Sequence, residues 1–181
     1  IGASYILEYC DADGCEDSAP VQVSGTLAEA IGYVKASNTG ANDQFGYSIA
    51  LSADGGTLAV GAPFEDSDAT GVGNVLNNGG AVYVYTRTAP GSWEFQAMLK
   101  ATDAGAGDQF GYSIALSADG NVLATGAPFE DSDATAVGEG LADSGAVYVY
   151  TRTAQAWTEQ QKLKASNADS YDWFGWSLAL S

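Results

Sequence analysis

The chain has 181 residues, and its 23 acidic and 6 basic side chains give a formal net charge of −17 at pH 7. This balance excludes the Lys/Arg-rich surface that nucleic acids or anionic membranes require, and it is compatible with divalent cations, cationic partners or a saline habitat. The chain has no histidine, which excludes nucleophiles activated by a histidine base and metal sites built from imidazole. Apolar residues make up 46% of the chain, so it is not a disordered acidic tail, and its apolar runs are too short to span a membrane.

The N-terminal segment, residues 1–25, is organised around two cysteines. Cys10 and Cys15 lie on either side of a turn signal, Asp13-Gly14, between two short extended runs. A disulfide that closes this hairpin is predicted, and it implies an oxidising compartment; the alternative is a pair of free thiols. The segment resembles the last hairpin of a fibronectin-III or immunoglobulin-like module.

Most of the remaining chain consists of a repeat in which one copy is displaced from the next by 65 residues. Three segments recur identically: Asp43–Gly55 as Asp108–Gly120, Gly61–Thr70 as Gly126–Thr135, and Gly80–Ala89 as Gly145–Ala154. A third copy begins with Phe174-Gly175-Trp176 and stops at Ser181. Because the chain lacks an initial Met and stops within a repeat, we expect both ends to be cuts through a longer protein.

Each repeat is predicted to form four short strands. In the first copy these strands are residues 47–52, 57–62, 81–88 and 93–101. Ala53-Asp54-Gly55 is a tight-turn signal, and Pro63 ends the second strand because proline cannot donate to a strand ladder. The third strand alternates Val with Tyr, as a half-buried strand does. Four antiparallel strands per repeat, with no helical periodicity, predict an all-β fold of tandem propeller blades.

Two short motifs make these blades similar to a known family. Phe45-Gly46 is followed by Gly61-Ala62-Pro63, Phe110-Gly111 is followed by Gly126-Ala127-Pro128, and Phe174-Gly175 opens the third copy. These motifs resemble the FG-GAP repeat, which builds the seven-bladed propeller of integrin α chains and of many bacterial surface proteins. The resemblance implies that Phe fills the wedge between neighbouring blades, that Gly beside it lets two backbones approach, and that Gly-Ala fits the crowded inner part of a blade.

The repeat boundaries predict five parts of the chain. These are the end of a β-sandwich module at 1–25, the last strand of a preceding blade with its connection at 26–44, blade 1 at 45–109, blade 2 at 110–173, and the first strand of the next blade at 174–181. Two blades cannot close a ring by themselves. We therefore expect either further blades beyond the ends, or several chains that complete a ring or stack as a solenoid.

The acids gather in segments that share one face of the predicted blades. The loops between second and third strands and the connections between blades lie on this face, and they hold 13 of the 23 acids and none of the bases. The negative electrostatic potential of this face concentrates cations. Among cations, Ca²⁺ prefers about six to eight hard oxygen ligands. The sequence therefore predicts Ca²⁺ as a cofactor, with the alternative that these carboxylates cap turns or solvate the surface. The candidate ligands are Glu65, Asp66, Asp68, Glu130, Asp131 and Asp133, with Asp43 and Asp108 nearby.

The calcium position that is usual in the family is not expected here. Calcium-binding integrin blades carry Asp-x-Asp-x-Asp-Gly between the first two strands, whereas this chain has Ser52-Ala53-Asp54-Gly55 and Ser117-Ala118-Asp119-Gly120. One carboxylate cannot build that site. Asp54 and Asp119 are therefore predicted to be turn residues.

Aromatic residues recur at fixed places in the repeat. The tyrosines of the third strands, Tyr83, Tyr85, Tyr148 and Tyr150, are predicted to pack between blades, with a sugar-stacking platform as the alternative. Trp173 and Trp176 are candidate ligand-binding residues. Trp173 stands where the two earlier copies have glutamine, so it is not a repeated packing position. Arg87 and Arg152 are expected to pair with acids on the face opposite the long loops.

These features predict an adhesion or ligand-binding module, extracellular or on a cell surface, whose partner is a protein or a glycan. No catalytic residue is expected, because residues duplicated in every blade favour a structural role over a catalytic pair that is needed only once. One alternative is a structural subunit of a surface filament or sheath that binds copies of itself. A second alternative is a carbohydrate-binding, lectin-like propeller.

Overall fold

The computed structural model describes residues 34–68, 73, 75–133 and 140–180, together with the backbone of four short strands nearer the N-terminus. The chain divides into two compact units, one of residues 1–34 and 88–93 and the other of residues 35–87 and 94–181. In the described part of the chain, no helix is long and apolar enough to cross a membrane.

The N-terminal strands form two antiparallel pairs. β1 (Ala3–Tyr5) pairs with β4 (Val21–Val23), and β2 (Glu8–Asp11) pairs with β3 (Gly14–Asp17). The register places Cys10 directly opposite Cys15. Opposed residues of an antiparallel pair have Cα atoms roughly 4.5–5.5 Å apart, a separation that a disulfide spans. The disulfide stays a prediction that this register favours, and the likeness to a fibronectin-III or immunoglobulin-like module also stays a prediction.

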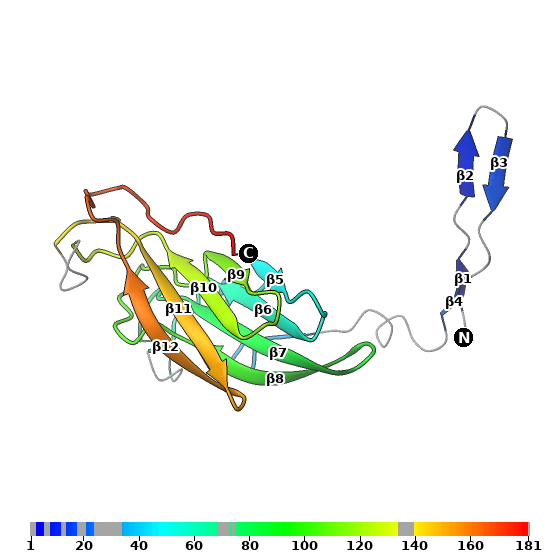
Figure 1. The fold of residues 1–181 in the computed structure, drawn as a ribbon. Helices are drawn as coiled ribbons and strands as arrows, with labels where there is room; N and C mark the ends of the chain where they lie inside the picture. Colours follow the sequence, from blue (N-terminus) through cyan, green and yellow to red (C-terminus); the bar gives the residue numbers. More distant parts are fainter. Residues whose placement is uncertain are drawn as a thin grey trace. The chain divides into compact units, whose positions relative to one another are not determined.

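Two four-stranded antiparallel sheets follow, called blade 1 and blade 2 (Figure 1). Blade 1 contains β5 (Ile49–Leu51), β6 (Thr57–Ala62), β7 (Ala81–Ala89) and β8 (Ser92–Leu99). Blade 2 contains β9 (Ser113–Leu116), β10 (Val122–Ala127), β11 (Ala146–Thr153) and β12 (Ala156–Leu163). In both sheets the strands lie in chain order. The predicted all-β fold of tandem four-stranded blades is confirmed.

Each blade has two chemically different faces, because side chains alternate along a strand. The face that carries the tyrosines of the third strand is called the tyrosine face, and the opposite one the valine face. In blade 1 the tyrosine face consists of Ile49, Leu51, Leu58, Val60, Tyr83 and Tyr85, and the valine face of Ala50, Ala59, Val82 and Val84. In blade 2 the corresponding sets are Ile114, Leu116, Leu123, Thr125, Tyr148 and Tyr150, and Ala115, Ala124, Val147 and Val149.

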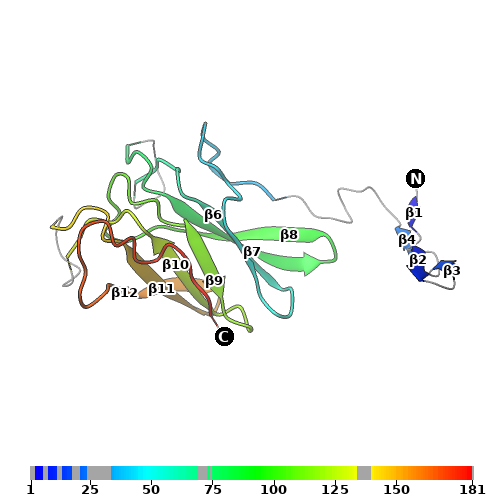
Figure 2. The same cartoon turned by 90° about the horizontal axis from the view of Figure 1, so that it is seen from above.

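The main core forms where the valine face of blade 1 packs against the tyrosine face of blade 2. Val82 and Val84 are buried there from one side, and Tyr148, Tyr150 and Phe110 from the other. The two sheets lie side by side in Figure 2. Because unlike faces meet, this contact is head to tail, and the same geometry can be repeated by each successive blade.

The Phe-Gly motif joins the blades through the backbone. Phe110 donates its N–H to the carbonyl oxygen of Gly79 at 3.1 Å and forms a parallel bridge with Gly80. Its ring stands edge-on to Tyr148 and Tyr150, with centroid separations of 5.4 and 6.0 Å. Phe110 is fully buried, so the expectation that this residue fills the wedge between blades is confirmed.

Glycine is required where the two backbones cross. Gly111 has a φ of +88°, and a Cβ at this position would lie 2.5 Å from the carbonyl oxygen of Ala81. A Cβ on Gly61 would overlap the carbonyl oxygen of Gly111 and the Oγ of Ser48. Ser48 Oγ itself donates a hydrogen bond to that carbonyl at 2.7 Å. The approach that the motif implies is therefore present at this junction.

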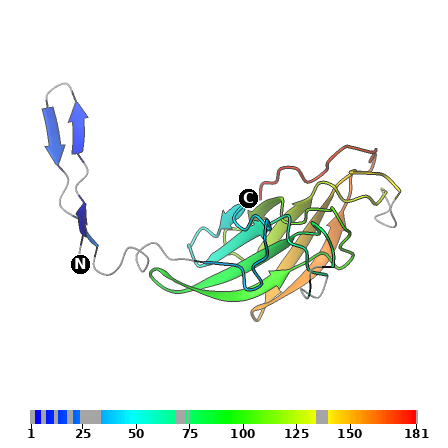
Figure 3. The same ribbon diagram turned by 180° about the vertical axis from the view of Figure 1, so that it is seen from behind.

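The third copy begins the same junction. Phe174 forms a parallel bridge with Gly145, and Ser113 Oγ donates to the carbonyl oxygen of Gly175 at 2.6 Å. The C-terminal segment, red in Figure 3, returns from the end of β12 to the side of β9. The structural repeat therefore follows the sequence repeat across all three copies.

Candidate functional site

Glu65, a predicted calcium ligand, is a buried acid with protein partners. Its Oε2 lies 2.7 Å from Lys100 Nζ, and its Oε1 accepts a hydrogen bond from Asn38 Nδ2 at 2.7 Å. Lys100 Nζ also donates to the carbonyl oxygen of Ser67 at 2.7 Å. Both carboxylate oxygens of Glu65 are thus engaged, and the ion pair ties the long loop of blade 1 to the end of β8.

Glu130, the equivalent acid of blade 2, binds two lysines. Lys162 Nζ lies 2.7 Å from its Oε1, and Lys164 Nζ lies 2.7 Å from its Oε2. The Ser132 N–H donates to Oε1 at 2.9 Å. Burial raises the pKa of Glu130, but the hydrogen bonds from the two lysines and Ser132 outweigh burial and hold the pKa below its ordinary value.

The lysines that reach these acids belong to the fourth strands and their ends, which the sequence pattern does not assign to the acidic face. Lys100 and Lys164 occupy equivalent places in a Leu-Lys-Ala segment, and Lys162 stands where blade 1 has Met98. Lys100 is 35 positions from its acid along the chain. The recurrence of Leu-Lys-Ala at the end of each fourth strand was the signal that could have found them.

Asp66 and Asp131 close the long loops. Asp66 Oδ1 accepts a hydrogen bond from the N–H of Asn78 at 2.8 Å, and Asp131 Oδ1 accepts one from the N–H of Asp143 at 2.7 Å. The carbonyl oxygen of Asp66 accepts a further bond from Leu76 at 2.8 Å. Each aspartate therefore holds the two ends of its loop together.

Asp43 and Asp108 close the turns that precede each Phe-Gly motif. Asp43 Oδ2 accepts a hydrogen bond from the N–H of Gly40 at 2.6 Å, and Asp108 Oδ2 accepts one from the N–H of Gly105 at 2.7 Å. The third copy has the same bond, from the N–H of Asp169 to Asp172 at 2.8 Å. These are the side-chain to backbone bonds typical of aspartate in turns.

The remaining two candidate ligands, Asp68 and Asp133, are half-buried and also interact within the protein. In the described ranges, no group of three or more acidic or cysteine side chains is arranged to hold a metal ion. The structure thus assigns structural contacts to the repeated acids of this face. Calcium binding stays a prediction.

Trp173 and Trp176 lie in a row of aromatic rings beside the long loop of blade 2. Their ring centroids are 5.5 Å apart, Phe129 lies 6.5 and 6.1 Å from them, and Tyr112 lies 4.7 Å from Trp176. Trp173 is 43% exposed and Trp176 47% exposed. These four residues, Tyr112, Phe129, Trp173 and Trp176, are called the aromatic cluster.

The tyrosines of the third strands are buried, so they are not exposed for stacking against a sugar. Each phenol reaches the segment that precedes its blade and donates a hydrogen bond there. Burial is the main cause that raises the pKa of Tyr148 above its ordinary value. The bonds join Tyr83 to Asn38 at 2.6 Å, Tyr85 to Lys35 at 2.7 Å, Tyr148 to Asp103 at 3.0 Å and Tyr150 to Lys100 at 2.8 Å.

The expectation that the arginines pair with acids is wrong for Arg152. Its guanidinium donates to Asn121 Oδ1 at 3.0 Å, to Gln96 Oε1 at 3.1 Å and to Thr57 Oγ1 at 3.0 Å, all neutral oxygens. The guanidinium carbon lies 5.3 Å from the ring centroid of Trp157. Within the described residues, the ion pairs involve lysines alone.

Asp54 and Asp119 hold tight turns, as predicted. Asp54 Oδ1 accepts a hydrogen bond from Ser52 Oγ at 2.6 Å, and Asp119 Oδ1 accepts one from Ser117 Oγ at 2.6 Å. The hydrogen bond from Ser117, followed by those from Asn121, lowers the pKa of Asp119 to about 2.

A model of the FG-GAP repeat matches the chain at residues 33–85, 93–150 and 157–181. A search of curated proteins found no match. The three matched segments include the Phe-Gly motif of each copy, from the complete blades to the opening of the third. Because they also cover more than half of the chain, this protein is a member of the FG-GAP repeat family.

Proposed function

We propose that this chain is part of an extracellular or cell-surface β-propeller that binds a protein ligand through the aromatic cluster and the acidic loops next to it. The observation that carries the proposal is Trp173. It is 43% exposed, and it has a left-handed backbone with φ of 52°. The equivalent Gln44 and Gln109 have the same backbone conformation with φ of 55°.

A tryptophan at this position is not explained by the repeat. The backbone of the other copies tolerates a polar side chain there, so the fold itself does not require an indole. Exposed tryptophan and tyrosine side chains are the residues most enriched in the energetic centres of protein interfaces. Trp173 rests on Phe129, at the start of the acidic loop of blade 2, so an aromatic anchor and negative charge lie next to each other.

The experiment replaces Trp173 with the residue that the other copies carry. Purified chain, Trp173→Gln and the control Phe95→Gln are tested by biolayer interferometry against immobilised fibronectin, laminin and collagen. Phe95 is equally exposed, at 46%, but lies on β8. Binding to a matrix protein that Trp173→Gln weakens about tenfold, and that Phe95→Gln retains, supports the proposal. Binding that both variants retain equally contradicts the role of the aromatic cluster.

The same variants separate the lectin alternative. Binding to a glycan array that depends on Trp173, with no binding to the immobilised proteins, replaces the protein-binding proposal with the carbohydrate-binding one. An exposed indole ring can pack against either kind of ligand. In either case we propose no catalytic role for the chain, since the repeated carboxylates described above hold loops and turns.

Calcium support of the acidic face is a further part of the proposal. Its basis is the density of hard oxygen atoms in the long loops, where Asp66 and Asp68 follow Glu65 and where Asp131 and Asp133 follow Glu130. The test compares the thermal unfolding midpoint in calcium and in chelator at matched ionic strength. A rise specific to calcium supports bound ions, because a ligand of the folded state stabilises it. Equal midpoints remove calcium from the proposal.

A specific observation favours the structural alternative as a second candidate. On the tyrosine face of blade 1, Ile49 and Leu51 are 64% and 56% exposed, whereas the equivalent Ile114 and Leu116 of blade 2 are partly buried against the core. The tyrosine face of blade 1 is thus exposed at the positions where the tyrosine face of blade 2 packs against blade 1. A valine face of another blade, in the same or another chain, is its complement.

Light scattering coupled to size exclusion tests association between chains. The second candidate expects the measured mass to rise with concentration, and it expects Ile49→Ser with Leu51→Ser to abolish the rise. Val75→Ser is the control, because Val75 is an exposed apolar residue outside this face. A mass that stays monomeric at all concentrations contradicts assembly through this surface.

A further inference from the structure

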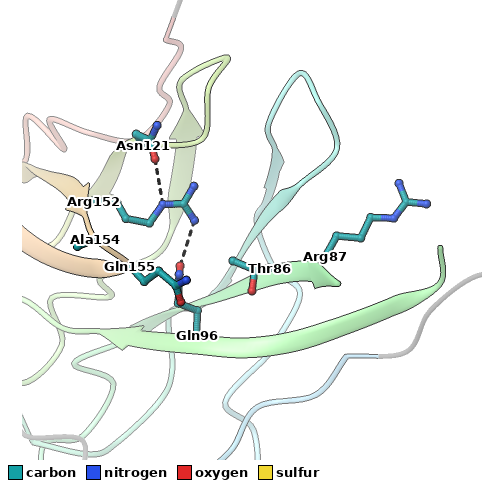
Figure 4. Close-up of a pocket in the computed structure, with 7 residues that line it drawn as sticks. All are labelled: Thr86, Arg87, Gln96, Asn121, Arg152, Ala154 and Gln155. Atoms are coloured by element: carbon teal, nitrogen blue, oxygen red, sulfur yellow. Dashed lines mark hydrogen bonds between the residues drawn. The ribbon is translucent and has the colours of Figure 1, made fainter. Parts of the chain in front are cut away.

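A cavity of about 460 Å³ lies at the end of the blades that carries the tight hairpins, away from the long loops. Its wall is made from both blades. The lining residues are Thr86, Arg87 and Gln96 from blade 1, Asn121 and Arg152 from blade 2, and Ala154 and Gln155 from the turn between β11 and β12. Figure 4 shows Arg152 directed toward Asn121 and Gln96, while the side chain of Arg87 points away from it. A volume of this size holds a small ligand.

Arg152 is held in one orientation by neutral groups. Nε donates to Asn121, Nη1 to Gln96 and Nη2 to Thr57, at 3.0–3.1 Å. The ring of Trp157 lies beneath the guanidinium, and its Nε1 also donates to Gln96 Oε1, at 2.9 Å. These bonds use three of the five N–H donors of the guanidinium. The side chain is therefore oriented in advance and retains two donors for a ligand.

The positive charge at this cavity is not neutralised by an ion pair within the described residues. Three of the six bases, Lys100, Lys162 and Lys164, are paired with acids, whereas both arginines of the chain line the cavity. The charge of Arg152 does reach Asp54, where it adds to the hydrogen bonds from Ser52 and Gly56 that lower the pKa of this carboxyl. In a chain with 23 acids, a guanidinium set among amides is available for an anion from outside.

The two repeats differ at this place, between two runs of residues that are identical in both copies. Asn121, which fixes Arg152, stands where blade 1 has Gly56. The turn of the second hairpin, Ala154-Gln155, has φ values of 49° and 70°, which are unfavourable for residues with a Cβ. Positive φ at both positions is the geometry of a two-residue hairpin turn, so the departure from the repeat at Asn121 is the feature that marks this wall of the cavity.

We propose that this cavity binds a sugar acid, with the carboxylate on Arg152 and the hydroxyl groups on the amides of Asn121, Gln96 and Gln155. A guanidinium pairs with a carboxylate through two parallel hydrogen bonds. Gln96 Oε1 already accepts from Arg152 and Trp157, and Asn121 accepts from Arg152 while its Nδ2 donates to Asp119 Oδ2 at 3.1 Å. These two amides therefore offer their remaining N–H donors to the hydroxyl oxygens of the sugar, and the Gln155 amide adds a donor and an acceptor. The site lies apart from the aromatic cluster, so it does not depend on the function proposed above.

The test is a titration of the isotopically labelled chain with D-galacturonate and with D-galactose, followed by amide and indole chemical shifts. The proposal expects galacturonate to shift the signals of Asn121, Gln155 and the Trp157 indole, and galactose to bind at least about tenfold more weakly. Equal binding of both sugars overturns the anionic site. Shifts that are absent from these residues overturn the location.

Variants separate the site from the fold. Arg152→Gln should weaken galacturonate binding about tenfold or more, and Asn121→Gly, which installs the residue of blade 1, should weaken it about threefold. Lys35→Gln removes the same charge at an exposed position and should leave binding unchanged, as should Trp173→Gln. If Arg152→Gln does not fold, the galacturonate affinities of Asn121→Gly and Lys35→Gln are compared with that of the native chain instead. Equal loss in Arg152→Gln and Lys35→Gln overturns the proposal, because it reports net charge alone, and galacturonate binding that Asn121→Gly leaves unchanged overturns the role of the residue that orients Arg152.

Discussion

Lys100 Nζ lies 2.7 Å from Glu65 Oε2, and the side chains of both residues are almost completely buried, at 3% and 2% exposure. This pair joins the long loop of blade 1 to the end of β8, and the hydrogen bond from Asn38 to Glu65 adds the connection that precedes the blade. A carboxylate that the sequence suggests as a cation ligand thus has its cation within the protein.

Removal of the lysine should destabilise the fold strongly. We expect Lys100→Met to lower the free energy of unfolding by about 3–5 kcal/mol, because Glu65 is left buried without its partner. The double variant Lys100→Met with Glu65→Gln should be less destabilised than Lys100→Met alone, since it leaves no buried charge unpaired. Urea denaturation measures both, with Lys35→Met as the exposed control. A double variant as unstable as the sum of its single variants would refute the coupling.

The ion pairs of Glu130 predict a dependence of stability on pH. The pKa of Glu130 in the folded chain is lower than its ordinary value of 4.5. A lowered pKa contributes stability that is present above the unfolded pKa and is lost as pH falls through the folded pKa. We therefore expect the difference in unfolding free energy between the native chain and Glu130→Gln to be constant near pH 7 and to shrink below about pH 4.5. A difference that grows on acidification would contradict the prediction.

Phe110 should be a large contributor to the contact between blades. It is fully buried against Tyr148 and Tyr150. Phe110→Ala is expected to cost about 3–5 kcal/mol, as truncation of a buried aromatic ring does. Phe95→Ala, at a position that is 46% exposed, should cost less than about 1 kcal/mol. Chemical denaturation compares the two, and similar costs would show that Phe110 is not the wedge.

Gly61 should not accept a methyl group. A Cβ there overlaps the carbonyl oxygen of Gly111 and the Oγ of Ser48, and the carbonyl belongs to the backbone of the next blade. We expect Gly61→Ala to lower the unfolding midpoint by several degrees, because the blades must move apart to accommodate the side chain. Gly140→Ala is the control, since the nearest atom to a Cβ there is 3.6 Å away. Equal midpoints for the two variants would exclude a tight crossing.

Much of the fold followed from local features of the sequence. The strands of a blade were predictable because the features that define them are local. These features are the alternation of Val and Tyr, the Ala-Asp-Gly turns and Pro63, and each sets the backbone conformation within a few residues. The Phe-Gly motif also indicated how blades meet, because a bulky ring next to a glycine recurs in every copy and must be packed in the same way each time. The aspartate turns at Asp54 and Asp119 were predictable for the same reason.

The sequence by itself determined the repeat, the four strands of each blade and the family. Only the tertiary structure decided which charges meet, because these partners lie far apart along the chain. Lys100 is separated from Glu65 by 35 positions, and Arg152 from Gln96 and Thr57 by 56 and 95. The sequence pattern places the acids on one face and the bases elsewhere, yet the folding of each blade buries lysines against its own acids, and the packing of one blade on the next sets Arg152 among neutral groups. The energy of a charge depends on its burial and its neighbours, and these are properties of the folded chain.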